Sequence, residues 1–142
     1  MRAALLCLGA LMFAFPSLVA QERSRVAANS RVYIEPSENG MHTALAGALT
    51  KKKVPLTMVV AADKADYVIT VVGEYKKAGW AKSIVSGGAA RGESNASMTV
   101  AHRESGEIVY AYNVDKGNAA RGLQSAAEAC AKHLGNHIKG KE

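Results

Sequence analysis

Apolar and polar residues alternate along three stretches in the middle of the chain. The stretches are Ala65–Tyr75, Ala96–His102 and Ile108–Val114, and each is rich in β-branched and aromatic residues. This pattern is typical of β-strands with one buried face. The first stretch carries apolar residues on both faces, so we expect it in the interior of a sheet. A short turn around Gly106 joins the last two stretches, which predicts an antiparallel meander.

The residues before this meander predict a strand, a helix and a second strand. Arg31–Glu35 is typical of a short strand that ends at Pro36, and Leu56–Val60 of a nearly continuous apolar strand. Between them, apolar residues recur with helical spacing at Met41, Ala44, Leu45, Ala48 and Leu49. A strand, a helix and a strand in so short a segment form a crossover unit, whose two strands are parallel.

The clearest element is a helix at the C-terminal end of the chain. Its apolar stripe runs from Leu123 to Ile138, and a basic residue and a glycine at 139–140 end it. The predicted element order is therefore β-α-β-β-β-β-α. We predict a single two-layer domain of the α/β (α+β) class over residues 31–140, in which two helices pack on a mixed five-stranded sheet.

Residues 1–20 have the layout of a secretory signal peptide. The basic start, Met1-Arg2, precedes an apolar run over Ala3–Phe15, and small residues close the segment at Ala20. The run is shorter than the roughly 20 apolar residues that a membrane-spanning helix needs. We therefore expect an exported protein, periplasmic or extracellular, with no transmembrane span in the mature chain and with residues 21–30 as a flexible leader. The alternative is an uncleaved N-terminal anchor.

The charge of the chain indicates which partners it favours, and its cysteine content indicates whether it can form a disulfide. The formal net charge of +6 favours contact with anionic envelope surfaces, and we find no nucleic-acid-binding motif and expect no nucleic-acid partner. Removal of residues 1–20 takes away Cys7 and leaves Cys130 as the one cysteine. An intramolecular disulfide is therefore excluded in the mature chain, although an exported protein enters an oxidising compartment.

Two short segments of the meander resemble a known envelope domain. They are Ala65–Thr70, with its Ala-Asp pair before an apolar strand, and Val100–Tyr110, a turn with Gly and Glu before a second strand. The domain is shared by the curli-secretion-channel lipoprotein, the lipoprotein activators of penicillin-binding proteins and the amino-terminal domain of the Tol translocation protein. The chain departs from that pattern at Val71, where the family usually has Gly, and at Ser105, where it has Thr. The resemblance spans about residues 31–138 and implies an envelope binding or assembly module.

A long loop between the first two strands of the meander carries basic residues and the one Trp. Long loops in compact domains are often functional, and an aromatic ring among cations suits an anionic polymer or a lipid headgroup. The candidate binding residues are Lys76, Lys77, Trp80, Lys82 and Arg91. The loop continues through glycines to Gly92. The alternative is that Trp80 folds back as an anchor of the core.

One set of side chains has the spacing of metal ligands. Cys130, His133 and His137 lie on neighbouring turns of the C-terminal helix, and a thiolate with two imidazoles suits zinc or copper. Against this, Cys130 lies on the apolar stripe, where a free cysteine commonly behaves as a small hydrophobic residue. A single helix also supplies three ligands at most. We expect no resident cofactor.

Candidate catalytic residues are isolated in the sequence. His42 and His102 have no accompanying nucleophile motif. The acidic pairs at 63 and 66 and at 104 and 107 flank turns, where carboxylates are usually solvated. We therefore predict a non-catalytic binding or assembly module of the cell envelope, which contacts an envelope protein or an anionic envelope polymer through the Trp80 loop or an exposed sheet edge. The alternatives are a metal-handling periplasmic protein that uses the Cys/His set, and an enzyme whose site shows no motif.

Overall fold

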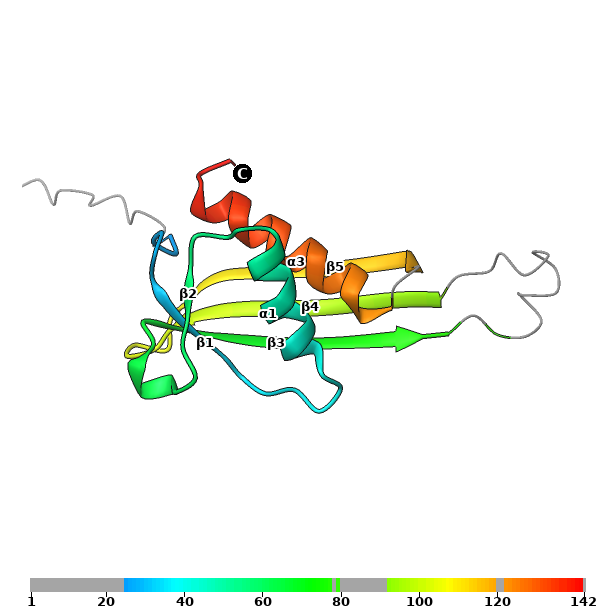
Figure 1. Ribbon diagram of the computed structural model, residues 1–142, viewed down its shortest axis with the longest axis horizontal. Helices are drawn as coiled ribbons and strands as arrows, with labels where there is room; N and C mark the ends of the chain where they lie inside the picture. The colour runs from blue at the N-terminus through cyan, green and yellow to red at the C-terminus, as the bar shows by residue number, and fades with distance from the viewer. Residues whose placement is uncertain (1–24, 78, 80–91, 120–121, 142) are drawn as a thin grey trace, which may run out of the picture.

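The computed structural model describes residues 25–77, 79, 92–119 and 122–141 (Figure 1). The elements, in chain order, are β1 (Arg31–Ile34), α1 (Met41–Lys51), β2 (Thr57–Met58), the 3-10 helix η1 (Ala62–Lys64), β3 (Tyr67–Lys76), β4 (Gly92–His102), β5 (Ile108–Ala119) and α3 (Leu123–Ile138). The five strands form one mixed sheet, and α1 and α3 pack on it. The predicted fold class and the order β-α-β-β-β-β-α are confirmed.

The sheet has the strand order β2-β1-β3-β4-β5. Strand β1 runs parallel to both of its neighbours, β2 and β3. Strands β3, β4 and β5 pair antiparallel, as the meander requires. The parallel crossover unit and the interior position of β3 are both confirmed, because β3 lies between β1 and β4.

The strand boundaries differ from the predicted ones on both sides of the long loop. Strand β4 begins at Gly92 and not at Ala96, and β5 continues to Ala119. Residues 92–95 are small or polar, so the apolar alternation does not mark them, but pairing with the end of β3 satisfies their main-chain groups. Strand β2 is shorter than predicted, since only Thr57–Met58 pairs with β1.

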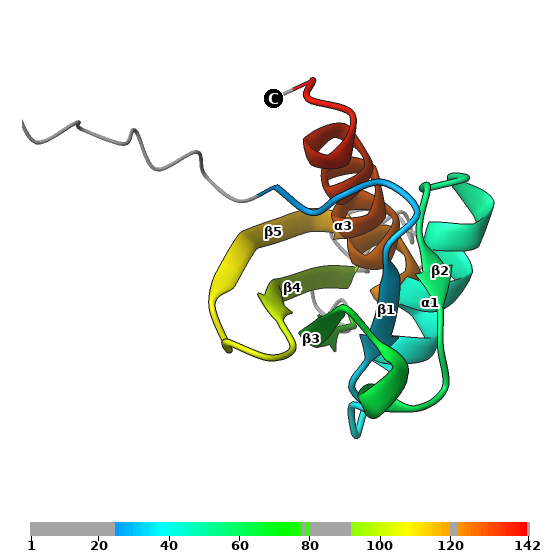
Figure 2. The same cartoon turned by 90° about the vertical axis from the view of Figure 1, so that its left-hand side faces the viewer.

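Both helices cover the same face of the sheet (Figure 2). The predicted stripe of α1 is buried at Met41, Leu45, Ala48 and Leu49. On α3 the buried residues are mostly small: Ala126, Ala127, Cys130, Ala131, Leu134 and Gly135. Side chains on the helix-facing side of β3 and β4, such as Ile69 and Met98, pack in the same core. Because these residues of α3 are small, the helix can approach the sheet closely, and small side chains are then enough to fill the core.

The packed domain begins before β1. Residues 21–30 were expected to form a flexible leader, but Val26 is 1% exposed and belongs to the core. The main-chain N–H of Asn29 also donates to the carbonyl of Pro55, at 2.7 Å. The apolar run Val26–Ala28 is only three residues long, which is too short a pattern to predict this contact. None of the helices in the described part of the chain has the length and apolar character of a membrane span.

Candidate functional site

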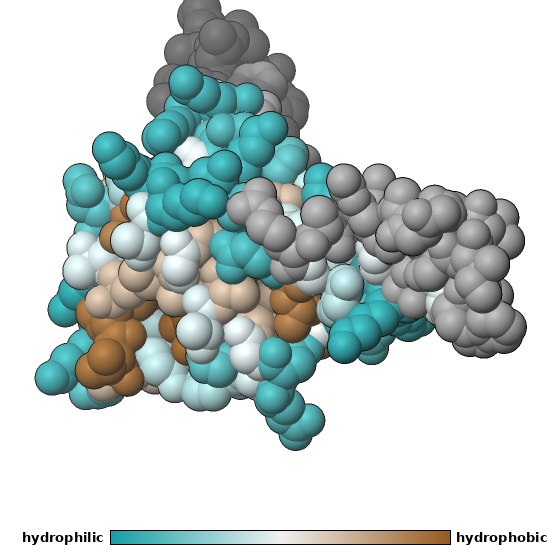
Figure 3. Space-filling view, turned by 45° about the vertical axis from the view of Figure 1, so that its right-hand side comes forward, coloured by the Kyte–Doolittle hydropathy of each residue, from teal (hydrophilic) through white to brown (hydrophobic). Residues whose placement is uncertain are grey.

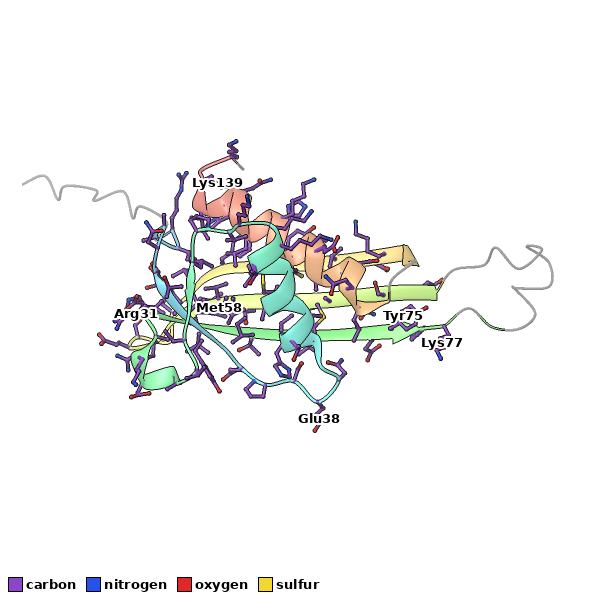
Figure 4. All side chains as sticks on the ribbon, in the orientation of Figure 1. Arg31, Glu38, Met58, Tyr75, Lys77 and Lys139 are labelled. Carbon is purple, nitrogen blue, oxygen red and sulfur yellow. The ribbon has the colours of Figure 1, made fainter. Side chains whose placement is uncertain are left out.

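The predicted binding loop leaves the sheet at the end of β3. Lys76 is the last residue of that strand, Lys77 follows it, and both side chains are exposed (Figure 4). Trp80, Lys82 and Arg91 lie outside the described residues. The far end of the predicted loop is strand and not loop, because Gly92 is buried in β4 beside the carbonyl of Lys76.

Tyr75 adds an aromatic ring to these two lysines. Its side chain is 38% exposed, although it lies on the helix-facing side of β3. The ring packs beside Gly122, where an added Cβ would lie 3.5 Å from it. Alternation along the strand places Tyr75 on the same face as Ile69 and Val71, which are both buried, but Tyr75 lies near the end of β3 and is partly open to solvent. Tyr75, Lys76 and Lys77 are consecutive exposed residues at the end of β3, and an aromatic ring and cations are residue types that suit an anionic polymer.

The Cys/His set of α3 is distributed between the core and the surface of β5. Cys130 is fully buried, and burial raises the pKa of its thiol to about 11. The ring of His133 stacks on Tyr112 at 4.3 Å between ring centroids, and that of His137 lies 4.4 Å from Tyr110. Metal binding needs a thiolate, which a raised pKa disfavours. Within the described residues, no group of three His, Cys, Asp or Glu side chains could hold a metal ion.

His42 belongs to the start of α1. The main-chain N–H of His42 donates to Ser37 Oγ, and the N–H of Ser37 donates to His42 Nδ1, both at 3.0 Å. Ser37 thus satisfies one of the free N–H groups of the first helical turn. The Nδ1 lone pair is already used by an N–H donor, so it is poorly placed to accept the proton of the nearby Ser37 hydroxyl.

Asp66 joins the beginnings of β1 and β3. Its carboxylate accepts the main-chain N–H of Arg31 at 2.8 Å and pairs with the guanidinium of the same residue at 2.8 Å. The hydrogen bonds from Arg31 hold the pKa of Asp66 below its usual value. Arg103 Nε donates to the carbonyl of Ala65 at 2.8 Å, which ties the β4–β5 turn to the same corner. The Ala-Asp pair of the family resemblance therefore has a structural explanation here.

This corner also contains a polar pocket of about 280 Å³. His102 lies in its lining, with its ring edge-on to Tyr67 at 5.4 Å between centroids. Asp63 and Asp66 also line the pocket, and the carboxylate of Asp66 forms an ion pair with Arg31. Glu104 pairs with Arg103 at 2.9 Å. The structure thus brings Asp63, Asp66 and Glu104 to one corner, where Asp66 and Glu104 each pair with an arginine.

A groove that the sequence did not predict lies beside β3. It has a volume of about 370 Å³ and is lined by residues 35–39, which connect β1 to α1, and by residues 70–72 of β3. The groove exists because β1 ends while β3 continues, and the connecting chain turns away toward α1 (Figure 1). Such a divergence depends on the relative lengths of two paired strands, which hydrophobic patterning does not determine.

Exposed apolar side chains are scattered over the described surface. The large ones include Val60, 98% exposed, and Val72 and Ile108, each 61% exposed. On the side drawn in Figure 3, strongly hydrophobic side chains lie in separate groups, with residues of intermediate hydropathy between them.

Comparison with known proteins identifies the fold. No protein-family model matches the chain, and no curated protein matches it. The PelC dodecamer from Paraburkholderia phytofirmans has a similar structure, with a TM-score of 0.52 and 15% identity over 79% of this chain and 89% of that one. This likeness shows that the two chains share a fold.

Two further solved structures are similar at a lower level. Uncharacterized lipoprotein B from Nitrosomonas europaea has a TM-score of 0.49 and 12% identity, over 81% of this chain and 88% of that one. TolB from Acinetobacter baumannii has a TM-score of 0.49 and 12% identity, over 82% of this chain and 31% of that one.

Proposed function

We propose that the protein is an exported, non-catalytic binding or assembly module of the cell envelope, which contacts an anionic envelope polymer or headgroup surface at the end of β3. The observation that carries the proposal is the joint exposure of Tyr75, Lys76 and Lys77. An amphipathic ring flanked by two flexible cations can stack on or insert into a surface while the ammonium groups meet phosphate or carboxylate. The formal net charge is +6 for the whole chain and +5 once Arg2 is removed with residues 1–20, and a positive charge supports approach to such a surface.

The contacts of the other candidate residues support a binding role. Ser37 and His42 cap a helix, Asp66 holds β1 against β3, and Cys130 is buried in the core. Each of these groups is used by the fold. The signal-peptide pattern of residues 1–20 adds the expected compartment, where anionic polymers and headgroups are abundant.

The test is co-sedimentation of the processed protein with purified peptidoglycan sacculi and, separately, with phosphatidylglycerol vesicles. We expect binding to one of them, accompanied by a blue shift in the emission of Trp80. A Lys76→Gln/Lys77→Gln double variant should bind about tenfold or more weakly, since each cation near an anionic surface contributes about 1 kcal/mol.

The matched control is Lys139→Gln/Lys141→Gln, which removes two exposed charges at the opposite end of the molecule (Figure 4). This control should bind nearly as well as the unmodified protein. Equal weakening by both double variants would mean that net charge and not this site drives binding. Failure of the unmodified protein to sediment with either material would contradict the proposal.

A further inference from the structure

Strand β3 has an unpaired edge beside the groove. Its pairing with β1 ends at Ile69, whose partner is Ile34, and the last hydrogen bond runs from the N–H of Glu35 to the carbonyl of Ile69 at 2.9 Å. Strand β3 then continues to Lys76, fully paired with β4 on its other side. Beyond Ile69, the edge that faces β1 therefore has no strand partner among the described residues.

The main-chain groups along this edge are donors and acceptors in a regular row. Because these groups alternate in direction along a strand, those of Val71, Gly73 and Tyr75 point to the same side as those of Ile69. The described residues supply one partner to this row, the side-chain amide of Asn39, which donates to the carbonyl of Gly73. A row of unpaired strand groups is a template for an added strand, and native proteins usually block or cover it.

The groove gives an added strand room and a charge preference. Its volume of about 370 Å³ lies directly against residues 70–72 of the edge strand. Of the described residues that line it, Glu35 and Glu38 are charged, and none is Lys, Arg or His. Glu35 is fixed close to β3 because the hydroxyl of Thr70 donates to its carboxylate. Val72, 61% exposed, offers apolar surface between these polar groups.

We infer that the edge of β3 from Val71 to Gly73 binds an extended, basic peptide segment of a partner protein by strand addition, in which a peptide N–H replaces the Asn39 amide at the carbonyl of Gly73. Main-chain hydrogen bonds to the edge supply affinity, and the side chains of alternate residues supply specificity. Lys or Arg side chains of the segment meet Glu35 and Glu38, and an apolar side chain lies over Val72. This site goes beyond the proposed function, since the Tyr75–Lys77 surface takes an anionic partner and this groove takes a cationic one.

The charge of the groove favours a basic protein segment over the other candidates. An anionic polymer would bring like charges together at Glu35 and Glu38, which is unfavourable. A single small cation would leave the row of main-chain groups unused. An extended peptide uses both features, because it carries its own row of N–H and C=O groups along with side-chain charge.

The experiment starts with a display library of random ten-residue peptides selected on the full-length protein. The selected peptides are synthesised, and their dissociation constants are measured by fluorescence anisotropy. We expect sequences in which Lys or Arg alternates with Val, Ile or Thr. A Glu35→Gln/Glu38→Gln variant should bind them at least fivefold more weakly, while Gln keeps an acceptor for the hydroxyl of Thr70. The control Glu104→Gln/Glu107→Gln, on the β4–β5 turn, should bind them unchanged.

Peptide N-methylation tests the strand geometry itself. Methyl groups on every second nitrogen of a selected peptide remove all main-chain donors from one of its edges. Methylation in one register should weaken binding at least tenfold, and methylation in the other register should leave binding within twofold.

Several results would overturn the inference. One is a selection that yields acidic peptides or no binding peptide at all. Another is an equal loss of affinity when the peptide is methylated in either register. A third is equal affinity of the selected peptides for the Glu35→Gln/Glu38→Gln variant and for the Glu104→Gln/Glu107→Gln control. A concentration-dependent dimer in sedimentation velocity that the Glu35→Gln/Glu38→Gln variant alters would assign the edge to a second copy instead. If the protein binds no basic peptide at this edge but still binds sacculi or vesicles, the proposed function stands and only the strand-addition site is refuted.

Discussion

At the scale of single residues, Gly73 shows how little space separates the sheet from α1. A Cβ added at Gly73 would lie 3.0 Å from the sulfur of Met41 and 3.1 Å from the carbonyl oxygen of Asn95. The side-chain sulfur can move, but the carbonyl oxygen belongs to β4 and is held by the sheet. The close approach of α1 to β3 thus requires a residue without a side chain at this position.

We therefore predict that Gly73→Ala destabilises the protein by about 1–3 kcal/mol, the usual cost of overpacking a core. Urea denaturation followed by circular dichroism measures the change. Gly47→Ala is the control, since a Cβ at that helical position meets nothing within 4 Å. It should stabilise the protein by about 0.5–1 kcal/mol, because Ala is the better helix former. Destabilisation of equal size in both variants would refute the packing argument.

At the scale of elements, side-chain contacts fix the pairing of β1 and β3 at the N-terminal ends of the two strands. Asp66, at the start of β3, receives both the main-chain N–H and the guanidinium of Arg31. At the other end the two strands diverge after Ile34, and the groove opens. The Asp66 contact therefore aligns the strands, and the groove is the consequence of their unequal lengths.

We predict that Asp66→Asn lowers the melting temperature at pH 7, because the ion pair with Arg31 is lost. The pKa of Asp66 is lowered in the folded state, so its contribution is present above the usual value of 3.8 and is lost as the pH falls below it. The difference in melting temperature between the two proteins should thus shrink as the pH falls below that value. Asp63→Asn, an exposed change in η1 outside the pair with Arg31, is the control and should leave the melting temperature at pH 7 nearly unchanged. A difference between Asp66→Asn and the unmodified protein that is equally large at pH 5 and at pH 2 would contradict this account.

Hydrophobic patterning was sufficient for the elements with strong periodicity. The stripe from Met41 to Leu49 and the stripe of α3 each predicted the buried face that the structure shows. The apolar residues on both faces of β3 predicted its interior position in the sheet. Patterning failed at Gly92–Asn95, which are small or polar and become a strand through pairing alone. It also failed at Val26, which begins an apolar run of only three residues and whose burial depends on tertiary contacts.

The candidate sites depended more strongly on tertiary structure. Spacing suggested that Cys130 acts with His133 and His137, but the helix turns the thiol into the core and lays the imidazoles on tyrosines of β5. The exposure of Tyr75 and the edge of β3 follow from where neighbouring elements end. Residue spacing along one element carries no information about the length of its neighbour.

At the scale of the whole molecule, the described domain offers two surfaces of opposite charge preference. The end of β3 presents Tyr75, Lys76 and Lys77, and the groove beside the same strand presents Glu35 and Glu38. On the two proposals above, one strand would carry a site for an anionic surface and, beside it, a site for a basic peptide. This arrangement is suited to a module that joins a protein partner to the cell envelope.

If the protein is exported to the envelope as we propose, its signal segment is removed, and the intact mass of the protein recovered from cells shows whether this has happened. The full-length chain is produced in a Gram-negative host, the cells are fractionated, and the intact mass of the protein is measured in each fraction. We predict a product that lacks residues 1–20 and begins at Gln21, found in the periplasmic and envelope fractions. Full-length protein that keeps residues 1–20 and stays in the cytoplasmic fraction would contradict the account.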